Sequence, residues 1–164
     1  MANKKIAIYG LIIAVYVTLS LTLGNLAYGL VQVRLSELLL VLCLYDKEYI
    51  LPVSLGCFLT NVIGVLDGMN PFILDIFIGT LATFLSAILV YLCRKISWFD
   101  KPILSLLLPV IVNGLMVGKE ISVYLEINFY LSFFYVALGE LLSVTILGLI
   151  VYKPLGKAIE NISK

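Results

Sequence analysis

The sequence predicts an all-α membrane protein: one domain spanning residues 1–164, built as a bundle of six transmembrane helices with both termini in the cytoplasm. Three observations lead to this prediction. The chain is 62% hydrophobic with a mean hydropathy of +1.13, more apolar surface than a soluble domain of 164 residues can bury. Its apolar residues fall into about six runs. Nine of its eleven Lys and Arg lie in the two terminal stretches and in those connections between runs that are predicted to face the same side of the membrane as the termini.

Short polar or turn-forming stretches separate the six runs. A spanning helix needs about 20 apolar residues, and the second run is short for a full span. The sequence DKE at 46–48 ends that run, and the turn cluster DGMNP at 67–71 separates the third from the fourth. Residues 119–128 are expected to form an outer turn or a short lid. The predicted helices are 6–28, 33–44, 50–66, 72–93, 102–117 and 129–152.

The distribution of basic residues sets the expected orientation, because Lys and Arg accumulate in cytoplasmic loops. With the N-terminus inside, only Arg34 and Lys119 fall on the outer side. A five-helix arrangement would scatter the charge over both sides. The residues predicted to face the cytoplasm are Lys4, Lys5, Lys47, Arg94, Lys95, Lys101, Lys153, Lys157 and Lys164.

The composition argues against several classes of function. A net charge of +1 provides no basic surface for nucleic acid. Histidine, the commonest general base and metal ligand, is absent. Cys43, Cys57 and Cys93 have no metal-type spacing and are interpreted as small core residues. No G-x-x-x-x-G-K-[ST] motif is present, so the chain cannot use ATP through a Walker loop. No catalytic residue, metal or cofactor is therefore expected.

The polar residues inside the runs mostly lie toward the outer end of the membrane. Ionisable groups are costly in a bilayer, so they are candidates for a functional site. Several of them, converging on one leaflet from different helices, predict a pocket for a polar ligand that opens to the outside. The candidate ligand-binding residues are Arg34, Glu37, Asn61, Asp75, Asn113, Glu120 and, nearer the midplane, Glu140.

Most of these residues also have a structural explanation. Asp75 follows a turn and is placed to cap a helix. Arg34 and Glu37 have the i, i+3 spacing of a helical ion pair. For Glu120 the alternative is an interfacial residue beside Lys119. Glu140 is the hardest to explain in this way, because the surrounding sequence ALGELL at 137–142 contains no cation.

An excess of carboxylates and amides favours a ligand rich in N–H donors or positively charged. A carboxylate can accept two parallel hydrogen bonds from a guanine-like edge, and a second carboxylate can pair with a ligand ammonium. Aromatic residues near the outer end of the sixth helix either stack on a planar ring or belong to an interfacial aromatic belt. These aromatic residues are Tyr130, Phe133, Phe134 and Tyr135.

Small residues form a stripe along the first predicted helix. Gly10, Ala14 and Thr18 recur every fourth residue, a spacing that lets another helix approach closely. The partner is either another helix of the same bundle or a separate membrane subunit. Gly79, Thr83 and Ala87 repeat the pattern in the fourth helix, where packing within the bundle is expected. Spacing alone leaves both explanations open for the first stripe.

An ordered set of motifs resembles the QueT family, the substrate-binding S components of energy-coupling factor (ECF) transporters for queuosine precursors. The resemblance extends over about residues 6–155, and no single motif would carry it alone. The motifs are VRLSE at 33–37, GCFLTN at 56–61, DIFIGTLAT at 75–83, PVIVNG at 109–114 and YVALGE at 135–140.

The resemblance implies a multi-pass S component of a bacterial plasma membrane that binds its ligand at the outer side. It implies three partner subunits, one transmembrane coupling protein and two ATPases, and a tipping of the docked S component that carries the ligand inward. The stripe of Gly10, Ala14 and Thr18 is then the docking surface. The implied ligand is a 7-deazaguanine, either queuine or its 7-aminomethyl precursor.

Other functions remain in competition. An S component for another vitamin or nucleobase would share the architecture, but an anionic ligand would need more cations than Arg34 and Lys119. A structural membrane subunit would leave the converging polar residues unexplained. A small intramembrane enzyme would need a nucleophile and base or a metal set, which a chain without histidine does not suggest.

Overall fold

The computed structural model describes residues 2–24, 27–29, 31–99 and 101–163, and this part of the chain is helical without strands. The prediction of an all-α membrane bundle is confirmed. Five helices are long and apolar enough to cross a membrane, and a sixth apolar helix is shorter. The candidate spans are Asn3–Leu23, Lys47–Leu66, Ile73–Cys93, Ile103–Tyr124 and Phe129–Ile159, with Leu35–Leu44 as the shorter helix.

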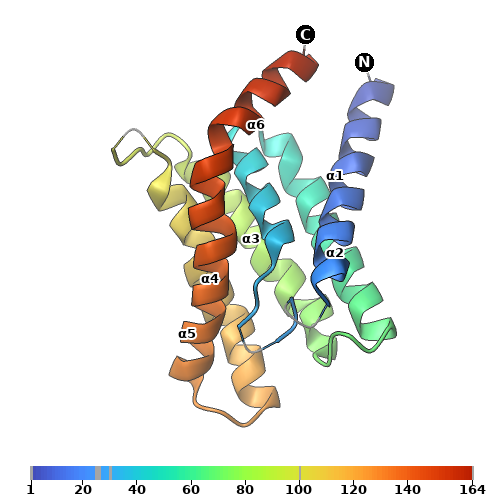
Figure 1. Cartoon of the computed structure of the whole chain (residues 1–164), viewed down its shortest axis with the longest axis vertical. Coiled ribbons are helices and arrows are strands. Elements are labelled where there is room, and N and C mark those ends of the chain that lie inside the picture. Colours follow the sequence, from blue (N-terminus) through green and yellow to red (C-terminus); the bar gives the residue numbers. More distant parts are fainter. Residues whose placement is uncertain (1, 25–26, 30, 100, 164) are drawn as a thin grey trace.

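Helices that follow one another along the chain pack side by side (Figure 1). The helix α1 (Ala2–Leu23) packs on α2 (Ile50–Leu66), which packs on α3 (Ile78–Cys93). Next come α4 (Ile103–Tyr124) and α5 (Phe129–Glu140), each against its predecessor. From α2 to α5 short connections join antiparallel neighbours, whereas α1 and α2 run in the same direction because the chain returns through the short helix Leu35–Leu44 between them.

The short helix η2 (Leu35–Leu44) lies inside this ring. It is a 3₁₀ helix of 10 residues that contacts α1, α3 and the last helix, α6 (Leu147–Ser163). Its Leu40 and Val41 are fully buried. Because the other helices surround it, η2 does not need to span the bilayer, since irregular backbone is tolerated where protein encloses it. Burial thus explains the short second run.

Residues 129–163 form one helix with a change of winding. The helix α5 passes at Glu140 into a π-helical segment, η5 (Leu141–Ile146), and then into α6. The prediction ended this helix at residue 152, too early. Lys153 and Lys157 lie on the exposed side of α6, so the helix continues as an amphipathic tail beyond the apolar run.

Two other helix boundaries differ from the prediction. The helix α1 ends at Leu23, before the predicted residue 28, because Gly24 adopts a φ of 45° that ends an α-helix. The helix α4 continues to Tyr124, beyond the predicted residue 117. The polar residue Glu120 suggested an exit from the membrane, but it is buried within the bundle.

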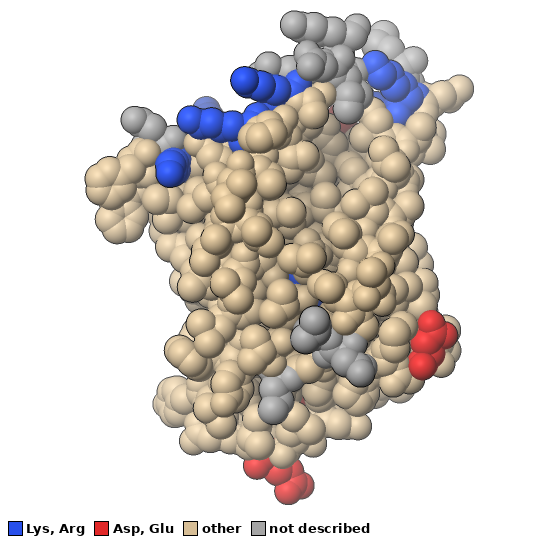
Figure 2. Space-filling model, in the orientation of Figure 1, with Lys and Arg blue, Asp and Glu red and all other residues tan. Residues whose placement is uncertain are grey.

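Charge distinguishes the two ends of the bundle. Both termini lie at the same end (Figure 1), and Lys and Arg gather there on the face seen in Figure 2. Acidic residues mark the opposite end of that face, where Asp67 follows α2 and Glu126 follows α4, both exposed. By the positive-inside rule, the end with the termini is cytoplasmic.

Labelling of single cysteines tests this orientation. In a background without the three native cysteines, Glu126→Cys should react with a membrane-impermeant maleimide on intact cells. Lys157→Cys should react only after the cells are permeabilised, because it belongs to the basic, cytoplasmic end. The reverse pattern would contradict the assigned topology.

Candidate functional site

The fold buries every polar residue that the sequence singled out. The most exposed of them, Glu120, has 7% of its surface accessible. They come from η2 and the segment before it, from α2, α4 and α5, and from η4 (Ile73–Ile76), a 3₁₀ turn ahead of α3. The buried set is Arg34, Glu37, Asn61, Asp75, Asn113, Glu120 and Glu140.

Arg34 and Asp75 form an ion pair inside the bundle, through Nη2 and Oδ2. Asn70 also donates to Asp75 Oδ2, over 2.9 Å, and Arg34 Nε donates to the carbonyl of Ala27 at 3.3 Å. These bonds tie the segment after α1 to the loop after α2. The alternative pair of Arg34 with Glu37 is not formed, because Arg34 precedes the helix with φ −94° and ψ 87° and its guanidinium pairs with Asp75 instead.

Asn61 forms a hydrogen bond to Asp75, and Gly79 leaves the space that the Asp75 side chain fills. Asn61 Nδ2 donates to the Asp75 carbonyl at 2.8 Å. A Cβ at position 79 would lie 2.1 Å from Asp75 Oδ1 and 3.0 Å from Asn61 Nδ2, so only glycine fits there. The expected packing of Gly79, Thr83 and Ala87 within the bundle is confirmed, since all three are buried.

Glu37 accepts hydrogen bonds from two residues that the sequence reasoning did not select. The Tyr16 hydroxyl and Thr83 Oγ1, the latter at 2.7 Å, both donate to Oε1. Tyr16 was overlooked as an ordinary apolar-run residue, and Thr83 was assigned to packing alone. Oε2 of Glu37 is buried and has no partner in the described part of the chain.

Further buried polar atoms lack a partner among the described residues. Among and beside the candidate residues they are both carboxylate oxygens of Glu120, Oε2 of Glu140, Oδ1 of Asp75, Oδ1 of Asn61, Nδ2 of Asn113 and Nε2 of Gln32. Buried polar groups in proteins are normally satisfied, so this concentration calls for donors and acceptors from outside the chain.

Gly139 brings Glu140 next to the segment that carries Arg34. A Cβ at position 139 would lie 2.1 Å from the Gln32 carbonyl oxygen. The backbone of α5 therefore touches the strand-like segment before η2 directly. Glu140 is also the last residue before the π-helical segment, a feature often found at functional sites.

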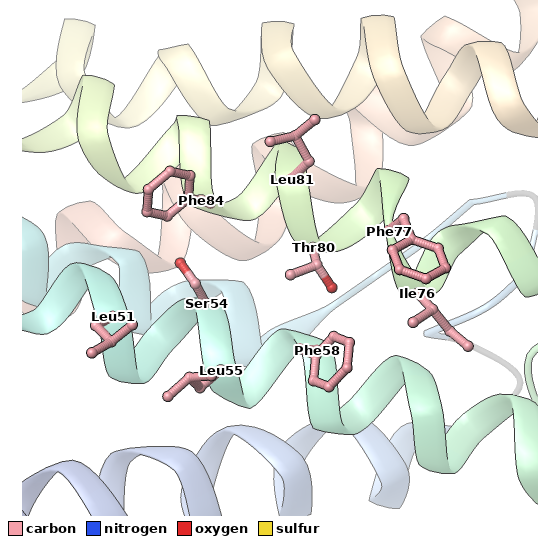
Figure 3. Close-up of a pocket in the computed structure, with 9 residues that line it drawn as sticks. All are labelled: Leu51, Ser54, Leu55, Phe58, Ile76, Phe77, Thr80, Leu81 and Phe84. Carbon is pink, nitrogen blue, oxygen red and sulfur yellow. The ribbon is translucent and has the colours of Figure 1, made fainter.

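A groove of about 570 Å³ runs along the outside of α2 and α3, away from the polar residues. Figure 3 shows its lining, which includes Leu51, Phe58, Phe77 and Phe84. These side chains are exposed by 36% or more and come from helices that can span a membrane. The groove is apolar and suits lipid contact better than a donor-rich ligand.

The aromatic residues of α5 do not form a stacking platform in this structure. Tyr130 is 79% exposed and Phe134 56% exposed, in keeping with an interfacial aromatic belt. Phe133 instead packs against Gly114 and Gly118 of α4, where any Cβ would meet it at about 3 Å or less. Its role is to join α4 and α5.

The small-residue stripe of α1 faces outward. Gly10, Ala14 and Thr18 are all exposed, and a Cβ at position 10 would meet nothing within 4 Å. Packing within the bundle therefore does not account for the stripe. Thr18 Oγ1 donates to the Ala14 carbonyl at 2.8 Å, so its hydroxyl is satisfied within the helix and presents a methyl group to the surroundings.

The three cysteines agree with their interpretation as core residues. Cys43 and Cys57 are buried, Cys93 is half-buried, and all are free. Within the described residues, no group of three or more His, Cys, Asp and Glu could hold a metal ion.

Comparison with known proteins gives two matches. The model of a family described as QueT transporter matches residues 6–157. The protein named Queuosine precursor transporter QueT, from Lactococcus lactis subsp. cremoris (strain MG1363), is 28% identical over 160 residues, which cover 92% of this chain and 90% of that protein. No solved structure matches the chain significantly.

Gly139→Ala tests the contact between α5 and the segment before η2. The new methyl group must displace the Gln32 carbonyl, and overpacking of this kind costs about 1–3 kcal/mol of unfolding free energy. The melting temperature in detergent should fall, whereas Gly10→Ala, with no neighbour within 4 Å, should leave it unchanged. Equal melting temperatures would show that the contact is not made.

Proposed function

The chain belongs to the QueT transporter family, and we propose from this premise that it is the substrate-binding S component of an ECF transporter. It is a multi-pass membrane protein and a transport protein rather than an enzyme. Its proposed task is to capture a queuosine precursor at the outer face of a bacterial plasma membrane and to deliver it inward.

One observation supports the proposal for the ligand: several buried polar atoms have no hydrogen-bond partner among the described residues. Carboxylate oxygens of Glu37, Glu120 and Glu140 are vacant acceptors, and the amide of Asn113 is a vacant donor. A 7-deazaguanine can donate two parallel hydrogen bonds to a carboxylate, from its N1–H and its exocyclic amine. Its carbonyl oxygen can accept a hydrogen bond from a side-chain amide. The set is thus complementary to a purine-like edge.

The contacts around Asp75 support a different role for three of the candidate residues. Arg34 pairs with Oδ2 of Asp75, and Asn61 and Asn70 hold the aspartate in place, while Oδ1 of Asp75 has no partner among the described residues. We assign to these four residues the support of the site, and to Glu37, Asn113 and Glu140 the direct contact with the base. Because all of them are buried, ligand binding requires the outer ends of the helices to separate and close again.

The energy for uptake must come from another subunit or an ion gradient, because the sequence has no Walker motif. Under the ECF proposal, a transmembrane coupling protein and two ATPases supply it. The exposed stripe of Gly10, Ala14 and Thr18 is the proposed docking surface, since small residues allow close approach of a partner helix.

Calorimetric titration of the detergent-solubilised protein tests the ligand assignment. Queuine and its 7-aminomethyl precursor should bind tightly and guanine weakly. Glu140→Gln should lower the affinity about tenfold or more, because a hydrogen bond to a charged group contributes about 1.5–3 kcal/mol. An unchanged affinity would remove Glu140 from the site. If a folded wild-type sample bound none of the three, the deazaguanine assignment would be wrong, and another donor-rich nutrient would be the ligand of the same architecture.

Ala14→Leu tests the docking surface. The larger side chain should keep the partner helix away, so the variant should bind ligand normally and fail to co-purify with the coupling module. Ala137→Leu on the half-exposed side of α5 serves as the matched control and should co-purify. Wild-type recovery of the complex with Ala14→Leu would refute the docking role.

A further inference from the structure

The buried charges of the bundle do not balance. Among the described residues, five ionisable side chains of the Asp, Glu, Lys and Arg type are less than a tenth exposed, and four of them are carboxylates. Arg34 is the single cation of this described set, and it already forms an ion pair with Asp75. The remaining carboxylates are Glu37, Glu120 and Glu140.

Carboxylates inside a bilayer are stable only with a cation, a proton or several hydrogen-bond donors. Glu37 has two donors, both on the same oxygen. Glu120 has no donor among the described residues, on either oxygen. The neighbouring Lys119 does not compensate it, because its side chain is exposed and its ammonium lies over the Phe129 ring, 5.8 Å from the centroid.

Glu120 also occupies a distinctive place. Its side chain lines a second groove, of about 290 Å³, between the start of α3 and the outer half of α4. Apolar residues such as Phe72, Met116 and Tyr124 form the rest of the lining, apart from Lys119. Glu120 also lies two turns beyond the buried Asn113, on the same face of α4. It therefore lies between this outer groove and the polar cluster.

We propose that Glu120 pairs with a positively charged substituent of the ligand and so makes the protein select cationic precursors over neutral ones. This inference rests on the proposed function. The base would bind at Glu37, Asn113 and Glu140, and its substituent would reach toward the groove, where Glu120 is the unpartnered charge. A ligand with a protonated amine would neutralise part of the acidic excess, whereas a neutral substituent would leave Glu120 buried and unpaired.

Two 7-deazaguanines that differ only at C7 provide the test: one carries an aminomethyl group, the other a nitrile. Both offer the same guanine-like edge, so they separate recognition of the base from recognition of the charge. The wild-type protein should bind the aminomethyl compound about tenfold or more tightly, the effect of a charge-assisted pair in a desolvated site. In Glu120→Gln, which keeps the shape of the side chain, this preference should fall to about threefold or less.

Two matched variants sharpen the assignment. Lys119→Gln changes the adjacent, exposed residue and should keep the wild-type preference. Glu120→Asp keeps the charge and should keep most of the preference, which gives a readout even if Glu120→Gln is poorly folded.

The outcomes distinguish this inference from the proposed function. Tight binding of both compounds with equal affinity by the wild type would overturn the selection of cations while leaving the deazaguanine assignment intact. An undiminished preference in folded Glu120→Gln would overturn the role of Glu120. If neither compound bound to a folded wild-type sample, the proposed function and this inference would both be wrong.

Discussion

The ion pair between Arg34 and Asp75 is the interaction on which the rest of the site depends. It joins the segment between α1 and η2 to the turn η4 before α3. These two segments are separated along the chain by η2, η3 (Lys47–Tyr49) and α2. Removing one partner of a buried pair leaves an uncompensated charge and costs about 3–5 kcal/mol, far more than the pair itself contributes. The pair is therefore a constraint on structure: while it is intact, both segments must stay in contact.

Two segments depart from regular α-helix, the 3₁₀ helix η2 and the π-helical segment η5, and both lie beside the buried polar residues. The central η2 is wound as a 3₁₀ helix and fully enclosed, so its short run can bring Glu37 into the interior without spanning the bilayer. The π-helical segment after Glu140 and the glycine before it let α5 lie against the Gln32 backbone. Gly79 leaves room for the Asp75 carboxylate in the same way. Small residues and altered winding thus bring polar groups together where bulky apolar residues would separate them.

Much of the architecture was predictable because hydropathy and charge act over whole segments. Ile50–Leu66 was predicted with its observed bounds, and the basic end with both termini was expected from Lys and Arg alone. The polar pairing was not predictable, because it depends on which segments meet in space. Arg34 was expected beside Glu37, three residues away, but its partner Asp75 is 41 residues away. For Glu120, a ligand-binding residue and an interfacial one were both open, because a polar side chain looks the same in sequence whether it faces water or a buried site.

The same limitation explains what the sequence did not reveal at all. Tyr16 and Thr83 complete the environment of Glu37, yet each sits in an apolar run where tyrosine and threonine are unremarkable. The groove along α2 and α3 is lined by ordinary membrane-facing residues and becomes visible only when the helices are packed. By contrast, Glu140 attracted attention because no nearby residue could neutralise it, and that reasoning needs no knowledge of the fold.

An experimental structure of the protein with 7-aminomethyl-7-deazaguanine bound is the most direct test of the central claim. That claim is that the ligand binds inside the bundle, among carboxylates that have no partner within the described part of the chain. The account predicts the base in contact with Glu37, Asn113 and Glu140, with the Arg34–Asp75 pair intact beside it. A ligand held in the apolar groove between α2 and α3, or one that takes Arg34 away from Asp75, would contradict it.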